Sequence, residues 1–135
     1  MTKTAEAAWQ KILADADAAA ERLGTPLSES FAALVRVAHA ESRLRQLCPW
    51  AGMWELHFSR CTESRYTRDV LYIGTLADGR FYVEGPNRDG PQTAETDNAH
   101  AAVRMVIEQL PPDCGPAFIG TTEELAAYEE ARNRT

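Results

Sequence analysis

Four side chains that take part in proton transfer, nucleophilic attack or metal binding alternate along a short stretch in the middle of the chain. They occupy every second position, with Leu56, Phe58 and Arg60 between them: Glu55, His57, Ser59 and Cys61. Strict alternation predicts a half-buried β-strand, because successive side chains of a strand point to opposite faces. We therefore expect Leu56 to face the core and His57 to lie on the outer, hydrophilic face.

Two of these residues, Glu55 and His57, are the candidate catalytic pair. A histidine two positions from a carboxylate on the same face has the composition of an oriented general base that works near pH 7. Cys61 lies up to ~13 Å along the strand from His57, too far for a thiolate–imidazole pair. A solvated sheet face and a ligand-binding surface are the alternatives, since a half-covered sheet exposes one polar face.

No metal site or cofactor is predicted. The spacing of Cys48, His57 and Cys61 fits no compact zinc knuckle, and no nucleotide-binding motif is present. A single cysteine is most often a small buried hydrophobic residue, so the reactivity of Cys48, Cys61 and Cys114 stays open.

A second candidate site is the corner around Trp50, which follows a proline. Trp50 with Arg43, Arg45 and Arg60 has the composition of a binding site for a partner or a carboxylate-bearing ligand, since aromatic and arginine side chains dominate such contacts. The alternative is structural, with Trp50 covering one end of the core and the arginines capping helix carbonyls.

Helical periodicity flanks this central region. Apolar spacing predicts an amphipathic helix over 4–23, ended by Gly24, and a second from Thr25-Pro26 to about Leu47, ended by Pro49. A third is expected from Thr96 or Asp97 to Leu110. A capping box over 121–124 opens a last helix.

The strand patterns lie between the second and third helices. A hairpin is expected from 69–73 and 80–84, joined near Asp78-Gly79, and a short apolar piece at 117–119 precedes the last helix. The whole chain, 1–135, is therefore predicted to form a single α+β domain in the order α-α-β-β-β-α-(β)-α. About three antiparallel strands form a small meander with helices packed on one face.

Charge and hydropathy exclude several classes of protein. The formal net charge is −6, and even the most basic part, 42–90, carries seven arginines against six acids, which argues against nucleic-acid binding. No run approaches the ~20 apolar residues of a membrane span. The odd count of three cysteines and the absence of an apolar leader favour the cytoplasm.

Several phrases of the sequence resemble a known family. These are RLRQL at 43–47, PW at 49–50, WELHFSRCT at 54–62, GR at 79–80, GP at 85–86 and LPPDCGPA at 110–117. Together they resemble DUF6193, a domain-of-unknown-function family of small actinobacterial proteins described as natural product biosynthesis proteins. The resemblance implies a context in specialised metabolism and no particular chemistry.

These observations favour a non-catalytic accessory or ligand-binding protein of natural-product biosynthesis. Its partner would be a biosynthetic enzyme, a carrier domain or a small-molecule intermediate. The alternatives are a small enzyme that uses His57 and Glu55 as acid and base on a pathway intermediate, and an immunity-type or regulatory protein. The sequence does not indicate an oligomeric state.

Overall fold

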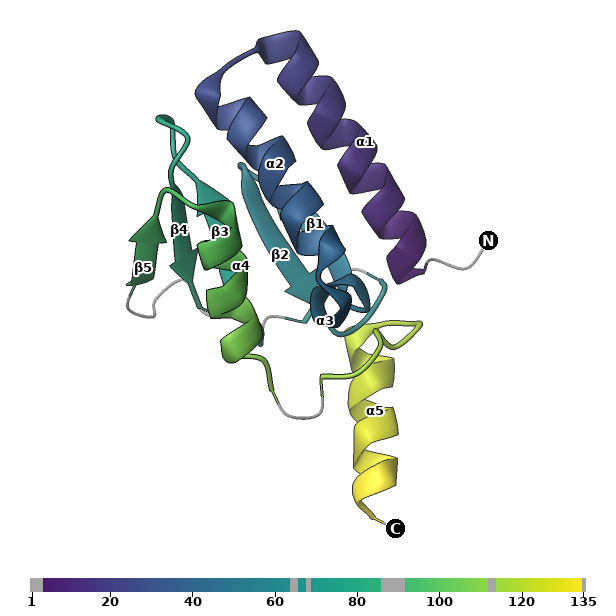
Figure 1. The fold of residues 1–135 in the computed structure, drawn as a ribbon. Helices are drawn as coiled ribbons and strands as arrows, with labels where there is room; N and C mark the ends of the chain where they lie inside the picture. The colour runs from purple at the N-terminus through teal and green to yellow at the C-terminus, as the bar shows by residue number, and fades with distance from the viewer. Residues whose placement is uncertain (1–3, 64–65, 68, 86–91, 112–113, 135) are drawn as a thin grey trace.

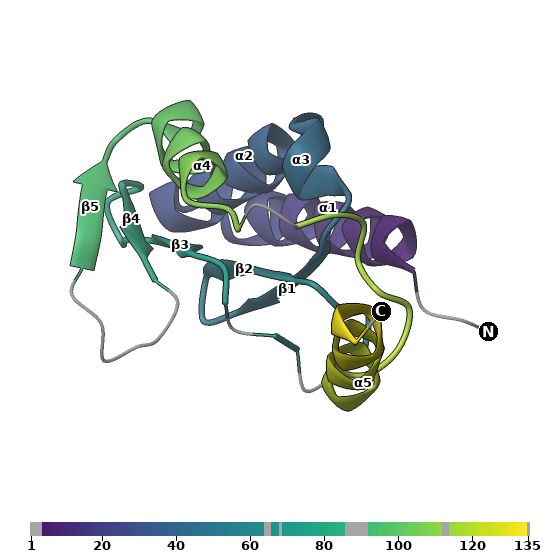
Figure 2. The same ribbon diagram turned by 90° about the horizontal axis from the view of Figure 1, so that it is seen from below.

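The protein has an α+β fold, described by a computed structural model over residues 4–63, 66–67, 69–85, 92–111 and 114–134. An antiparallel sheet with strand order β1-β2-β3-β4-β5 carries helices α1, α2 and α4 on one face (Figures 1 and 2). The predicted fold class and the helical cover on one face are confirmed. The sheet has five strands rather than about three.

The first two helices form an antiparallel hairpin across the sheet (Figure 1). Helix α1 spans Ala5–Leu23 and ends at Gly24, whose φ of 60° is left-handed. Helix α2 begins at Pro26 with Thr25 as its cap, as predicted, but it ends at Ala40. Glu41 takes an extended conformation (φ −86°, ψ 117°), so the expected continuation to Leu47 is wrong and a separate short helix, α3 (Ser42–Arg45), follows.

The sheet is a simple meander in which each strand pairs with the next one along the chain. Its strands are β1 (Cys48–Gly52), β2 (Glu55–Ser59), β3 (Tyr72–Thr75), β4 (Phe81–Glu84) and β5 (Gln92–Thr96). The sequence does not predict strands β1 and β5. For β1 the reason is that its Pro-Trp-Ala-Gly segment has the composition of a corner. The first predicted strand is therefore the second strand of the sheet.

A two-residue turn joins β1 to β2. Both of its residues, Met53 and Trp54, have positive φ (54° and 63°), as a type I′ hairpin turn requires. The alternation of Trp54, Leu56 and Phe58 predicts Trp54 on the inward face of a strand. It lies in the turn instead, half-buried, and packs edge-on against Phe31 of α2 with ring centroids 5.6 Å apart.

The core lies between the sheet and the helices. Leu56, Ile73 and Val83 on successive strands are fully buried and pack with α1, α2 and α4 residues in one apolar cluster. The inward position of Leu56 is thus confirmed, and alternation places Glu55 and His57 on the outer face.

Two helices follow the sheet. Helix α4 spans Ala99–Glu108 and is capped by Asn98, one residue after Asp97 and two after Thr96, the two predicted caps. Phe118 then forms a parallel bridge with Cys61, and α5 (Thr122–Asn133) opens with the predicted capping box of Thr121 and Glu124. Helix α5 projects from the end of the body, apart from the helices that cover the sheet (Figure 1).

Candidate functional site

The outer face of β2 brings the predicted catalytic pair into contact. His57 Nε2 lies 3.1 Å from Glu55 Oε1, and the two side chains are only 14% and 10% exposed. The pair therefore does not lie on a solvated sheet face. An imidazole held by a carboxylate is the arrangement that orients a general base.

Aromatic rings enclose the imidazole. Trp50 of β1 is the direct cross-strand neighbour of His57, and its ring stacks on the imidazole with centroids 3.9 Å apart and planes 13° apart. Tyr72 of β3 stacks on the opposite side at 4.5 Å, and Tyr66 stacks on Trp50 at 5.6 Å. We call this row of rings, Tyr66, Trp50, His57 and Tyr72, the aromatic clamp.

A tyrosine from two strands away completes the Glu55 contacts. The Tyr82 hydroxyl of β4 donates to Glu55 Oε2 at 2.7 Å, so both carboxylate oxygens are engaged. The ring reaches Glu55 across Gly74 of β3, where a Cβ atom would lie 1.9 Å from Tyr82 Cζ. Glycine at 74 thus makes the Tyr82–Glu55 contact possible. Burial, together with the bond to Glu55, raises the pKa of the Tyr82 hydroxyl well above its ordinary value.

Two further polar groups lie in the clamp. The Tyr72 hydroxyl donates to Glu84 Oε2 on β4. The Trp50 indole N–H is buried and has no hydrogen-bond partner among the described residues. A buried donor without an acceptor costs about 1–3 kcal/mol, so an acceptor brought to this N–H would be bound favourably.

The chemistry of His57 is constrained by this enclosure. Trp50 and Tyr72 cover both faces of the ring, and Nε2 faces Glu55. A reacting group would therefore have to approach the Nδ1 edge. Two hollows lined by described residues lie elsewhere: one beside α5 and one beside Trp54, and neither is lined by His57.

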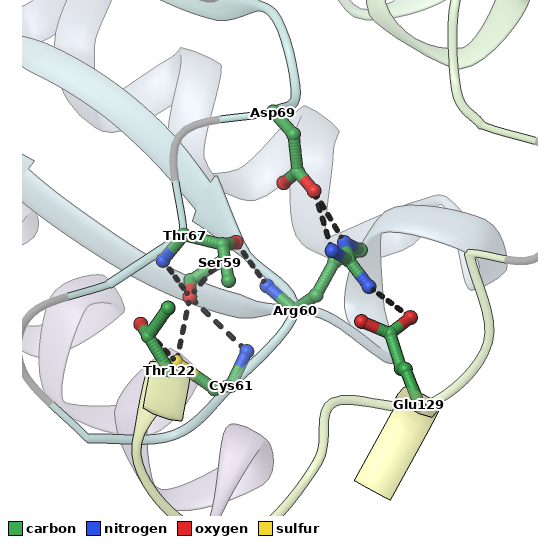
Figure 3. Close-up of polar contacts among 7 residues, drawn as sticks. All are labelled: Ser59, Arg60, Cys61, Thr67, Asp69, Thr122 and Glu129. Carbon is green, nitrogen blue, oxygen red and sulfur yellow. Dashed lines mark hydrogen bonds and ion pairs between the residues drawn. The ribbon is translucent and has the colours of Figure 1, made fainter. Parts of the chain in front are cut away.

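Arg60, a predicted ligand-binding residue, is held between two carboxylates (Figure 3). Its Nε and Nη2 atoms lie 2.6 Å from Asp69 Oδ2, and Nη1 lies 2.9 Å from Glu129 Oε2 of α5. Burial lowers the pKa of the guanidinium, but the bonds to the two carboxylates outweigh it and the net shift is upward. Arg60 therefore joins α5 to the loop after β2.

The other predicted binding residues are not gathered at one place. Trp50 belongs to the aromatic clamp on the outer face, whereas Arg43 and Arg45 are exposed on α3, which lies with the covering helices (Figure 2). Arg43 Nη1 lies 3.4 Å from the Ile107 carbonyl oxygen of α4. The structure thus divides the predicted arginine–tryptophan site between the two sides of the sheet.

The remaining members of the alternating pattern, Ser59 at the end of β2 and Cys61 just after it, belong to a buried cluster of hydroxyls and a thiol (Figure 3). The Ser59 hydroxyl accepts from the backbone N–H groups of Cys61 and Thr67 at 3.1 and 3.0 Å. The Cys61 thiol is fully buried, 3.4 Å from Thr122 Oγ1 of α5. These contacts satisfy polar atoms and fasten the loop to α5, which is a structural role. Cys48 and Cys114 are buried as well.

Three tyrosines of this region, Tyr66, Tyr72 and Tyr82, were not among the predicted site residues. Tyr72 and Tyr82 both occur in strands that the sequence predicted, at positions that alternate with apolar residues. That alternation predicts that Tyr72 and Tyr82 point outward. Tyr66 precedes β3 in a segment without periodicity and gave no signal.

The model of a family of unknown function, DUF6193, matches residues 3–121, which is most of the chain. The chain belongs to this family. No curated protein and no solved structure matches it. The matched residues include the whole sheet and the aromatic clamp, whereas α5 lies beyond them.

Two searches of the described residues complete the account of the site. No group of three or more His, Cys, Asp or Glu side chains among them is placed to hold a metal ion. None of the helices in the described part of the chain has the length and apolar character of a membrane span.

Proposed function

We propose that this protein is a non-catalytic binding protein of specialised metabolism that takes up a small-molecule intermediate at the aromatic clamp. The observation that carries the proposal is the buried Trp50 N–H, which lacks an acceptor among the described residues although its ring is held by stacking on both sides. A ligand that brings a hydrogen-bond acceptor to the edge of the Trp50 ring would satisfy this N–H, while the stacked neighbours hold the ring in place. The resemblance noted for the sequence supplies the metabolic context, and the odd number of cysteines supports a cytoplasmic protein.

The physical argument concerns preorganisation. The rings of Trp50, His57 and Tyr72 are already stacked, so a ligand would not have to order them on binding. The carboxylate of Glu55 holds the edge of the His57 ring through Nε2. Rigid aromatic side chains with a small number of placed polar groups are typical of small-molecule sites.

A retention experiment tests the proposal. The purified protein would be incubated with a metabolite extract of its source organism, separated from unbound material and analysed by native mass spectrometry. Trp50→Phe keeps an aromatic ring and removes the N–H, so we expect retention of the bound molecule to fall about tenfold. Trp54→Phe, in the turn between β1 and β2, is the matched control and should retain the molecule like the unmodified protein, because Trp54 packs against Phe31 and not in the clamp.

Two results would contradict the proposal. One is that the unmodified protein retains no small molecule. The other is that Trp50→Phe retains it as well as Trp54→Phe does, which would remove the indole N–H from recognition.

The 3.1 Å contact between His57 and Glu55 favours a second candidate, a small enzyme in which His57 transfers a proton and Glu55 orients it. On this hypothesis His57→Gln lowers kcat at least a hundredfold and leaves KM nearly unchanged, because general acid–base catalysis typically contributes 10²–10⁴-fold. The measurement is conversion of a retained metabolite on prolonged incubation. Conversion at an equal rate by His57→Gln would exclude the enzyme hypothesis.

A further inference from the structure

A hollow beside the β1–β2 turn is lined by residues of α1, α2 and the end of β1. Its volume is about 230 Å³, below the about 300–1,000 Å³ of sites that enclose a whole small molecule, so it has room for one part of a ligand. Ile12, Ala16 and Ala19 contribute to it from one face of α1, at helical spacing. Phe31 of α2 and Trp54 of the turn, whose rings pack edge-on at 5.6 Å, add aromatic surface.

The lining of this hollow carries no unbalanced charge. Asp15 is the one ionisable side chain among the described lining residues, and it is paired with Lys11 at 2.6 Å, with both side chains largely exposed. The other described lining residues are apolar or, at Gly52, without a side chain. An ion would lose water there without gaining a partner, whereas a hydrocarbon group gains by leaving water. The hollow therefore suits an uncharged, apolar group.

The turn at the mouth of the hollow is held in an unfavourable conformation. Met53 and Trp54 both have positive φ, which is uncommon outside glycine and an outlier for a side chain as bulky as Trp. Met53 lines the hollow and yet is 87% exposed, so packing within the protein does not account for a large apolar side chain at this position. Backbone strain of this kind concentrates at functional sites, and methionine is an adaptable apolar contact.

We infer that this hollow binds the straight hydrocarbon tail of a small amphiphilic molecule, with Met53 folding over the tail and the polar head group remaining in water. The uncharged lining matches the tail, and the limited volume leaves the head group outside. The strained turn keeps a flexible apolar side chain at the mouth, where it can cover tails of different length. The inference goes beyond the proposed function, because none of the aromatic clamp residues lines this hollow.

A titration of the full chain with 1-alkanols tests the inference, with NMR detection of the Ala16, Ala19 and Met53 methyl groups. We expect saturable shifts, with a Kd on the order of 1 mM for 1-hexanol. From 1-butanol upward, each added methylene should tighten binding about fourfold until the tail fills the hollow, and the gain should then stop. Hexylamine and hexanoate should bind within about threefold of 1-hexanol, since their head groups stay in water and meet no unpaired charge. Trp50→Phe should leave the titration unchanged, which separates this site from the proposed function.

Two neighbouring alanines of α1 supply a matched pair of variants. Ala19→Leu places a larger side chain in the hollow and should weaken binding of 1-hexanol at least tenfold. Ala18→Leu lies on the exposed side of the helix and should not change it. Alanine and leucine are both strong helix formers, so both variants should keep the helical circular dichroism signal of the unmodified protein.

Met53→Asn tests the contribution of the turn. Asparagine tolerates positive φ better than methionine, so this variant should fold, and loss of the thioether should weaken binding of 1-hexanol about threefold. The inference is overturned if no saturable shift occurs, if affinity does not rise with tail length, or if a charged head group changes it more than tenfold. It is equally overturned if the two alanine variants behave alike, or if Met53→Asn binds as tightly as the unmodified protein.

Discussion

The two faces of the sheet are ordered by different means. On the inner face, Leu56, Ile73 and Val83 are buried against helices in a cluster of apolar side chains. On the outer face, Glu55 is also buried, but under aromatic rings and hydrogen bonds from β1, β3 and β4. Helices α1, α2 and α4 all lie on the other face of the sheet (Figure 2).

The difference shows what each kind of order requires. Apolar packing is tolerant, because many hydrophobic residues of suitable size fill an inner face. The outer network is exacting, since each polar atom needs a partner at the right distance and a lost partner leaves a buried group unsatisfied. We therefore expect the apolar packing of the inner face to contribute most of the free energy of unfolding. The hydrogen bonds of the outer face should instead select one arrangement of its side chains.

The largest expected effect tests the inner face. Leu56→Ala removes a fully buried side chain and should lower the free energy of unfolding by about 2–5 kcal/mol, measured by urea denaturation. His57→Ala, the next residue on the outer face, should cost about 1–2 kcal/mol, for lost stacking and one hydrogen bond. Equal costs at the two positions would show that the outer face stabilises the domain as much as the core does.

A smaller effect tests the passage of Tyr82 over β3. Gly74→Ala places a methyl group where the Tyr82 ring lies, so it should cost about 1–3 kcal/mol, as overpacking does. Gly52→Ala on β1 is the control, because a Cβ there meets no atom within 4 Å. In a Tyr82→Ala background the cost of Gly74→Ala should largely disappear. A cost that persists would place the clash elsewhere.

Alkaline pH should weaken the outer network before the inner one. The pKa of Tyr82 is raised above its ordinary value of 10.0, so the folded state holds the phenolic proton more tightly than the unfolded chain does. The stability that protonated Tyr82 contributes is complete below pH 10 and is lost as the pH rises through the raised pKa. Tyr82→Phe should thus show a shallower loss of stability above pH 10 in urea titrations. An unchanged slope would mean that other groups govern the loss.

The sequence predicts the inner face well because that information is local. Alternation across 54–59 identifies Leu56 as inward, and the capping signals at Thr25 and Thr121 mark where helices begin. The outer network depends on register across three strands. Tyr82 meets Glu55 only because each residue lies opposite Gly74, a relation that no single segment contains.

Strand β1 could not be predicted from the sequence for a different reason. Hairpin turns with positive φ at both positions strongly favour Asn-Gly or Asp-Gly, and here the turn is Met53-Trp54. Pro49 within the strand weakened the signal further, since proline is found in edge strands, and β1 is indeed an edge. The aromatic clamp depends on the pairing of Trp50 with His57. This pairing could not be predicted, because the sequence of the turn does not indicate a hairpin.

The same turn provides the smallest and most discriminating test, because its two residues share a strained conformation and differ in packing. Met53 is 87% exposed, so Met53→Asn relieves strain and loses little contact. It should raise the free energy of unfolding by about 0.5–1 kcal/mol. Trp54→Asn relieves similar strain but removes the contact with Phe31, so it should lower stability. If both variants were destabilised, the turn conformation would not be strained, and the hairpin that places Trp50 against His57 would be a local preference of this sequence.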